Sequence, residues 1–338
     1  MRDRVIVRWT FLLRVAILLR ESFPPGQSLM SLFVQLPPAD YSRTAFDKFM
    51  PLWAGFDLDD ARAMMWMSQL AYETDAPQTI ATVGPLWGFK SIAHVRVQGA
   101  RIDTRAIIGE RPDCVVVAFA GTDPALGKNL ITDADCRLTP NDTHEGFQFA
   151  IDAAWADIEQ KLTALIAAGP RPIFFAGHSL GAALAVLAAE KVKDGPLAPA
   201  KIYTFGMPRA GGQIFKTRYD RTLGDRTYRL VHGGDTVPSI PDSTTVQGMP
   251  ARFLHVGRLL TCMSGGKFDR SAPLSDASSN DPRFLDGARA NLRNRMRALL
   301  AGQIFAPTGP GALGRLYALL PFGIRDHLPD RYLQALEP

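Results

Sequence analysis

The pentapeptide Gly-His-Ser-Leu-Gly at residues 177–181 constrains the fold of this chain more than any other sequence feature. An apolar run precedes it at residues 172–176, and an alanine-rich run follows it at residues 182–192. This order predicts a buried strand, a sharp turn and a helix. A turn that tight accepts only small residues beside its centre, which explains a glycine two positions on either side of Ser179. The alternative is a glycine-rich turn with an incidental serine, and the flanking strand and helix argue against it.

The rest of the chain alternates short apolar runs with segments of helical period. Predicted strands lie at residues 92–97, 114–120, 173–176, 202–205 and 228–231, and predicted helices at 59–73, 146–168 and 182–192. Alternation of this kind is typical of βαβ units, so we expect an α/β fold with a mostly parallel central sheet flanked by helices. Met64, Met65 and Met67 in the first helix are expected to lie in the core.

A serine hydroxyl needs a base to take its proton and a carboxylate to orient that base. In an α/β protein with this kind of turn, the expected chain order is serine, acid, histidine. Asp235 follows a predicted strand at the edge of the sheet where such sites form, and Asp242 is its rival. Two histidines come later in the chain. His327 lies in a polar segment expected to be a loop before a C-terminal helix, with an exposed imidazole, and His255 lies in an apolar run at residues 252–257 expected to be a strand. We favour Ser179, Asp235 and His327 as the catalytic set.

Two backbone or side-chain donors are expected to hold the negative oxygen that forms during attack on a carbonyl. One is the N–H of Leu180, directly after the nucleophile. The other is Thr122, which follows the predicted strand at residues 114–120 and offers both an N–H and a hydroxyl.

Charge is concentrated at the N-terminus of the 338-residue chain. Residues 1–20 hold five arginines and one acid, Asp3, and so supply +4 of the formal net charge of +5. The remainder is nearly neutral, which argues against nucleic-acid binding. The three cysteines show no Cys-x-x-Cys spacing, so neither a disulfide framework nor a zinc site is expected. A reducing compartment is compatible with them.

Residues 1–20 are also apolar, but the arginines limit the longest uncharged run to five residues, too short to span a bilayer. A basic, partly amphipathic helix there would suit peripheral contact with a membrane surface. The alternatives are an export signal or an over-extended start, with Met30 as the true first residue. We expect an N-terminal segment and proline-rich linker at 1–40, a catalytic domain at 41–338, and a cytoplasmic or peripheral-membrane location rather than secretion.

Six motifs in this order resemble the class 3 lipase family, the fungal-type triacylglycerol lipases and their bacterial relatives. They begin at Phe119 (Phe-Ala-Gly-Thr), His144 (His-Glu-Gly-Phe), Gly177 (the pentapeptide), Thr204 (Thr-Phe-Gly-Met-Pro-Arg), Asp235 (Asp-Thr-Val-Pro) and Asp326 (Asp-His). The resemblance covers residues 55–338 and implies an α/β-hydrolase fold. It also implies that Ser179 is the nucleophile, Asp235 the acid and His327 the base, with Thr122 and Leu180 as oxyanion donors.

The resemblance further implies a lid within residues 124–142, centred on residues 128–131. Family lids often carry a tryptophan there, where this chain has Leu130. The implied substrate is a lipid ester at a lipid–water interface, and the implied reaction is hydrolysis through an acyl-enzyme, with no cofactor and no metal. Asp133 and Asp135 lack the glycine and terminal glutamate of a calcium loop. His144, His178 and His232 are expected to be hydrogen-bonded structural residues. Alternatives are a lipid-binding module on an inactive scaffold, or acyl transfer or phospholipid hydrolysis at the same site.

Overall fold

The computed structural model describes residues 34–99, 102–121, 137–241, 253–276 and 322–338. Within these residues, eight strands form one sheet in the order in which they occur in the chain. Strands β3 to β7 run parallel, whereas β1, β2 and β8 make antiparallel pairs at the two sides. The expected α/β fold with a mostly parallel central sheet is therefore confirmed. The strands are β1 (Ser91–Gln98), β2 (Asp103–Glu110), β3 (Val115–Phe119), β4 (Ile173–His178), β5 (Lys201–Phe205), β6 (Thr227–His232), β7 (Arg258–Cys262) and β8 (Ser275–Asp276).

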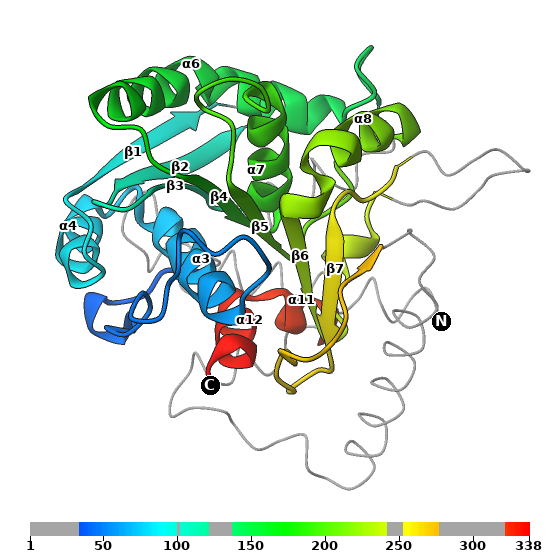
Figure 1. Ribbon diagram of the computed structural model, residues 1–338. Helices are drawn as coiled ribbons and strands as arrows, with labels where there is room; N and C mark the ends of the chain where they lie inside the picture. Colours follow the sequence, from blue (N-terminus) through cyan, green and yellow to red (C-terminus); the bar gives the residue numbers. More distant parts are fainter. Residues whose placement is uncertain (1–33, 100–101, 122–136, 242–252, 277–321) are drawn as a thin grey trace, which may run out of the picture.

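Helices cover both faces of the sheet (Figure 1). On one face lie α6 (Glu145–Ala168), α7 (Leu180–Lys191) and α8 (Gln213–Leu223), and on the other α3 (Leu58–Leu70) and α12 (Pro329–Leu336). Successive residues of β3 divide between the faces: Val116 and Ala118 pack toward α3, and Val115 and Val117 toward α6 and α7. This alternation is why the central strands are apolar throughout. The remaining helices are α4 (Pro77–Leu86), α11 (Phe322–His327) and the short 3₁₀ turns Pro38–Asp40, Ala71–Glu73, Gly224–Arg226 and Val237–Ser239.

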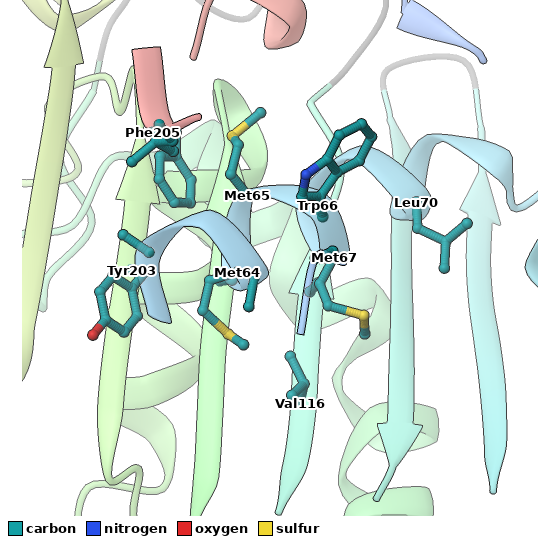
Figure 2. Close-up of a cluster of buried hydrophobic side chains, with 14 of the residues drawn as sticks. Met64, Met65, Trp66, Met67, Leu70, Val116, Tyr203 and Phe205 are labelled. Carbon is teal, nitrogen blue, oxygen red and sulfur yellow. The ribbon is translucent and has the colours of Figure 1, made fainter. Parts of the chain in front are cut away.

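Helix α3 begins at an N-cap, Asp57, whose carboxylate accepts hydrogen bonds from the N–H groups of Asp59 and Asp60. Such a cap satisfies backbone donors that have no partner inside the helix. Met64, Met65 and Met67 are fully buried, as predicted from their spacing. Figure 2 shows these side chains over the sheet residues Val116, Tyr203 and Phe205. Helix α3 thus packs across the middle of the sheet. It runs from the amino ends of the parallel strands toward their carboxyl ends.

Two local predictions were wrong. The run at residues 252–257 is described from residue 253 on, and residues 253–257 are not a strand: they make one isolated bridge, from Leu254 to Gly211, and β7 begins only at Arg258. Gly257 has a φ of +77°, which ends the extended backbone before it can pair along the sheet. His327 lies not in a loop but at the last position of helix α11, and its side chain is buried rather than exposed.

No helix among the described residues is long and apolar enough to cross a bilayer. Residues 1–33, which carry the basic N-terminal segment, lie outside the described ranges. Gln35 and Leu36 lie in the segment predicted to precede the domain boundary at residue 40. Both residues hydrogen-bond to the 3₁₀ turn Ala71–Glu73 at the end of α3.

Candidate active site

Ser179 sits at a sharp turn between the end of β4 and the start of α7. Its backbone has φ 59° and ψ −131°, a conformation that non-glycine residues seldom adopt and that costs energy. The Ser179 N–H donates to the carbonyl of Phe205, at the end of the neighbouring strand β5. The serine is therefore held by its backbone at the carboxyl edge of the parallel strands.

The glycines of the pentapeptide are required by space. A Cβ on Gly177 would lie 2.2 Å from the carbonyl oxygen of Gly181, and one on Gly181 would lie 2.4 Å from the carbonyl oxygen of Phe119. Real Cβ atoms do not approach backbone so closely. The strand, the turn and the helix pack against one another at this point, as predicted from the glycine spacing.

The structure brings Asp235 and His327 together. His327 Nδ1 lies 2.8 Å from Asp235 Oδ2, and the other carboxylate oxygen accepts the N–H of Val237. Asp235 has no exposed surface and His327 is 8% exposed. With Nδ1 donating to the carboxylate, the neutral imidazole keeps its lone pair on Nε2, the atom that a general base needs. The rival histidine, His255, is occupied elsewhere, 2.7 Å from the carbonyl oxygen of Pro238.

Gly206 lies between this pair and the strand end that holds Ser179. It follows Phe205, whose carbonyl holds Ser179, and a Cβ on Gly206 would lie 2.7 Å from Asp235 Oδ2 and 2.9 Å from His327 Nδ1. The ring of His178, the residue before Ser179, lies 4.7 Å from the ring of His327. The three residues chosen from the sequence thus lie at the same edge of the sheet, although they are far apart in the chain.

Tyr332, on α12, was missed by the sequence reasoning. Its hydroxyl donates to Asp235 Oδ2 at 2.6 Å and accepts the backbone N–H of His232. Burial, with the neighbouring charge of Asp235, raises the pKa of Tyr332 well above its usual value, so the hydroxyl remains a donor. No local pattern marks this tyrosine, because its partner lies 97 residues earlier.

The three structural histidines are hydrogen-bonded, as expected. His144 caps α6 by accepting the N–H of Phe147, and His232 Nδ1 lies 3.2 Å from the carbonyl oxygen of Asp326. His178 bonds through both ring nitrogens and is buried, which lowers its pKa well below the usual value; the nearby His327 lowers it further. His178 is therefore a neutral ring beside the reacting residues and not a second base.

The oxyanion side is described in part. Leu180 is the first residue of α7, so its N–H belongs to the helix terminus that lacks intrahelical acceptors. On the facing loop, a Cβ on Gly121 would lie 2.8 Å from the Cβ of Ser179. The loop therefore reaches Ser179 at its last described residue.

Several predicted features fall outside the described residues. They are Thr122, the rival acid Asp242, the pair Asp133 and Asp135, and the lid except its last residues, 137–142. Within the ranges that the structure does describe, no group of three or more histidine, cysteine or acidic side chains is arranged to hold a metal ion.

Comparisons with known proteins agree with this geometry. Residues 116–245 match the family described as Lipase (class 3). The chain is 36% identical over 248 residues to a secreted mono- and diacylglycerol lipase of Malassezia globosa, covering 68% of this chain and 79% of that protein. It is 26% identical over 213 residues to a lipase of Caenorhabditis elegans, covering 59% of each chain, so it spans less than two thirds of that relative.

The fold is also found in a solved structure. The Rhizomucor miehei lipase in complex with its propeptide superposes with a TM-score of 0.53 at 19% identity, covering 76% of this chain and 89% of that one. At this identity the likeness concerns the fold alone. The match to the family and the extent of the M. globosa similarity together show that this chain belongs to the class 3 lipase family, a family of carboxylic ester hydrolases.

Proposed function

We propose that this protein hydrolyses the carboxylic ester bonds of acylglycerols through an acyl-enzyme on Ser179. The observation that carries the proposal is the buried hydrogen bond from His327 to Asp235, beside a serine held in a strained turn. The M. globosa relative, described as a mono- and diacylglycerol lipase, supports acylglycerols as the substrate class.

The reaction has two halves. Ser179 Oγ attacks the ester carbonyl while its proton passes to His327 Nε2, and the N–H of Leu180, with Thr122, holds the oxyanion. The bond to the alcohol breaks, and His327 returns the proton to that leaving oxygen. Water then attacks the acyl-enzyme and gives a proton to His327. His327 passes that proton to Ser179 Oγ as the bond between this oxygen and the acyl group breaks, which releases the fatty acid and restores the serine. Asp235 keeps the imidazole in the required tautomer throughout.

The test measures fatty-acid release from emulsions of mono-, di- and triacylglycerols and from phosphatidylcholine vesicles. We expect release from acylglycerols by the wild type and none by Ser179→Ala, with His255→Ala retaining the wild-type rate. Fatty-acid release from phosphatidylcholine and from none of the acylglycerols would show that the substrates are phospholipids and would contradict the proposed substrate class. A folded wild type with no release from any of these lipids would favour a lipid-binding module without catalysis.

We also propose that the protein acts at a lipid–water interface and that residues 1–20, within the N-terminal segment 1–40, add contact with the membrane surface. The support is their composition, five arginines and one acid among apolar residues. In vesicle flotation, the full chain should float more than a chain starting at Met30, and more with anionic lipid present. Equal flotation of the two chains would contradict the membrane contact without affecting the catalytic proposal.

A further inference from the structure

A second hydrogen-bonded chain lies behind the candidate active site. The hydroxyl of Tyr72 lies 2.7 Å from His178 Nδ1, and His178 Nε2 lies 2.7 Å from the backbone carbonyl oxygen of His327. At the other end, a Cβ on Gly121 would lie 2.5 Å from the Tyr72 hydroxyl oxygen, so this hydroxyl packs directly against the backbone of the oxyanion loop. Tyr72 is 4% exposed and His178 is 2% exposed. The chain therefore joins the oxyanion loop to the catalytic histidine through buried groups.

The direction of every bond in this chain is fixed. A carbonyl oxygen only accepts, so His178 Nε2 carries the hydrogen that goes to His327. A neutral imidazole with its hydrogen on Nε2 has a lone pair on Nδ1, so the Tyr72 hydroxyl must donate to it. The hydrogen of the tyrosine is thereby committed to His178, while its oxygen lies against the loop at Gly121.

Burial holds the chain in this single state. It lowers the pKa of His178 and raises the pKa of Tyr72, so neither group ionises near neutral pH. The neutrality of His178 matters because the His327 ring, 4.7 Å away, becomes positive each time it accepts a proton. A second positive ring at that distance would oppose proton transfer.

We propose that Tyr72 and His178 are positioning residues that hold the oxyanion loop and the catalytic histidine in register with each other. The inference rests on the proposed ester hydrolysis. Gly121 directly precedes Thr122, the proposed donor, and His327 is the proposed base, more than two hundred residues later in the chain. Stabilisation of an oxyanion depends on donors fixed before the reaction, so loss of the Tyr72 hydroxyl should slow the chemical step more than it weakens substrate binding.

The backbone of Tyr72 is held independently of its hydroxyl. Its carbonyl oxygen accepts hydrogen bonds from the side chains of Arg105 and Gln35. Tyr72→Phe therefore removes the hydroxyl that bonds to His178 and packs against Gly121, while the ring and the backbone anchors remain. The matched control is Tyr219→Phe, because Tyr219 is also buried, bonds through its hydroxyl to Thr227, and lies on α8 outside the site.

The first experiment compares kcat and KM of these two variants, with rates normalised to the titrated active sites. We expect Tyr72→Phe to lower kcat by about tenfold to a hundredfold with KM changed less than about threefold, and Tyr219→Phe to keep the wild-type kcat. Phosphonylation of Ser179 should slow in parallel in Tyr72→Phe. A kcat within about twofold of the wild type in folded Tyr72→Phe would overturn the proposal.

The second experiment tests whether the two residues act as one unit. His178→Phe keeps a ring but removes both nitrogens. Once Tyr72→Phe has broken the chain, adding His178→Phe should cost much less in kcat than it costs alone. Additive losses would contradict a shared role.

The third experiment needs no variant. In ¹⁵N-histidine NMR spectra of the wild type, His178 should remain neutral with its hydrogen on Nε2 from about pH 5 to about pH 8. A His178 that titrates in this range, or that carries its hydrogen on Nδ1, would overturn the assigned chain even in a protein without esterase activity. Failure of the wild type to hydrolyse esters would count against the proposed function instead, so the two failures are distinguishable.

Discussion

The two edges of the parallel sheet both bury polar groups, and α3 together with the turn that follows it reaches both. At the amino edge, Asp60 in the first turn of α3 pairs with Lys201 at the start of β5, with Nζ and Oδ2 2.7 Å apart. At the carboxyl edge, Tyr72 contacts His178 at the end of β4. The same helical segment therefore serves two buried clusters of different kinds.

In the amino-edge cluster, both carboxylate oxygens of Asp60 accept hydrogen bonds from buried neighbours. The second carboxylate oxygen of Asp60 accepts the N–H of Met50, so the pair and a backbone donor satisfy one another. At the carboxyl edge, the bonds described above use Nδ1 and the backbone carbonyl oxygen of His327, and the proposed reaction uses its other ring nitrogen, Nε2. The comparison teaches that the buried charges at the amino edge are paired with each other where α3 packs on β5, whereas the buried groups at the carboxyl edge orient His327 for the proposed proton transfer.

Asp235→Asn should give the largest effect. An amide at this position can donate to His327 Nδ1, which favours the tautomer with its hydrogen on Nε2 and prevents that atom from accepting the serine proton. We expect kcat to fall by about 10⁴-fold while the fold remains intact. Steady-state kinetics and circular dichroism check this, with the exposed Asp225→Asn as the matched change. A fall of less than about tenfold would mean that the carboxyl-edge cluster does not direct the proton.

Lys201→Met should affect stability rather than catalysis. It leaves Asp60 buried without its cation, and burial already raises the pKa of this carboxyl despite the Lys201 hydrogen bond. Removing one partner of a buried ion pair costs about 3–5 kcal/mol, which denaturant titration would measure. Lys161→Met, which removes a half-exposed pair on α6, should cost about 0.5 kcal/mol or less.

The same experiment separates the two edges. The kcat of Lys201→Met per titrated active site should stay within about twofold of the wild type, because Lys201 lies at the edge away from Ser179. A large loss of kcat in a folded Lys201→Met protein would show that the edges are coupled.

Acid should destabilise the protein through its buried histidines. Burial lowers the pKa of His178, His232 and His255 from the ordinary 6.5. Below about pH 6.5 these histidines bind protons in the unfolded chain but stay neutral in the folded chain. The stability that comes from this difference is therefore fully present above that pH and is lost as the pH falls. Each histidine changes the free energy of unfolding by about 1.4 kcal/mol per pH unit between its pKa in the folded chain and its pKa in the unfolded chain.

His255→Gln isolates one such contribution. The difference in unfolding free energy between this variant and the wild type should change with pH, at a rate no greater than the contribution of one histidine. Burial raises the pKa of Asp60 and of Glu73, so these carboxyls change the stability with pH in the opposite direction. Their contributions are the same in both proteins and cancel in the difference between the two unfolding free energies. Parallel pH curves for the two proteins would contradict a neutral, buried His255.

The sequence predicted local features better than distant contacts. Strands β3 to β6 were identified because burial on both faces leaves uninterrupted apolar runs. Helix α6 was identified from apolar residues that recur at helical spacing, and α7 from its alanine-rich composition after the turn. Strand β2 was missed because charged residues interrupt it, and α4 because Pro77 and Pro85 obscure its helical period. The mistaken strand at residues 252–257 reflects a run whose composition suits a sheet but whose backbone turns at Gly257.

The candidate site divides in the same way. Ser179, Asp235 and His327 were identified because each has a local signature and the chain order is fixed by the fold. Tyr72 and Tyr332 were not, because each meets its partner across about a hundred residues and looks like any other core tyrosine in the sequence. Gly206 is intermediate: its motif was noted, but the reason for the glycine, contact with both Asp235 and His327, is visible only in three dimensions.

The most direct test of the central claim is to treat the folded protein with a fluorophosphonate probe and to map the labelled residue by mass spectrometry, with and without detergent. We predict that the label lies on Ser179, is absent from Ser179→Ala, and forms much more slowly in His327→Ala but at the normal rate in His255→Ala. A label on another serine, or no label on the folded wild type in either condition, would contradict the assignment of this edge of the sheet as an esterase site.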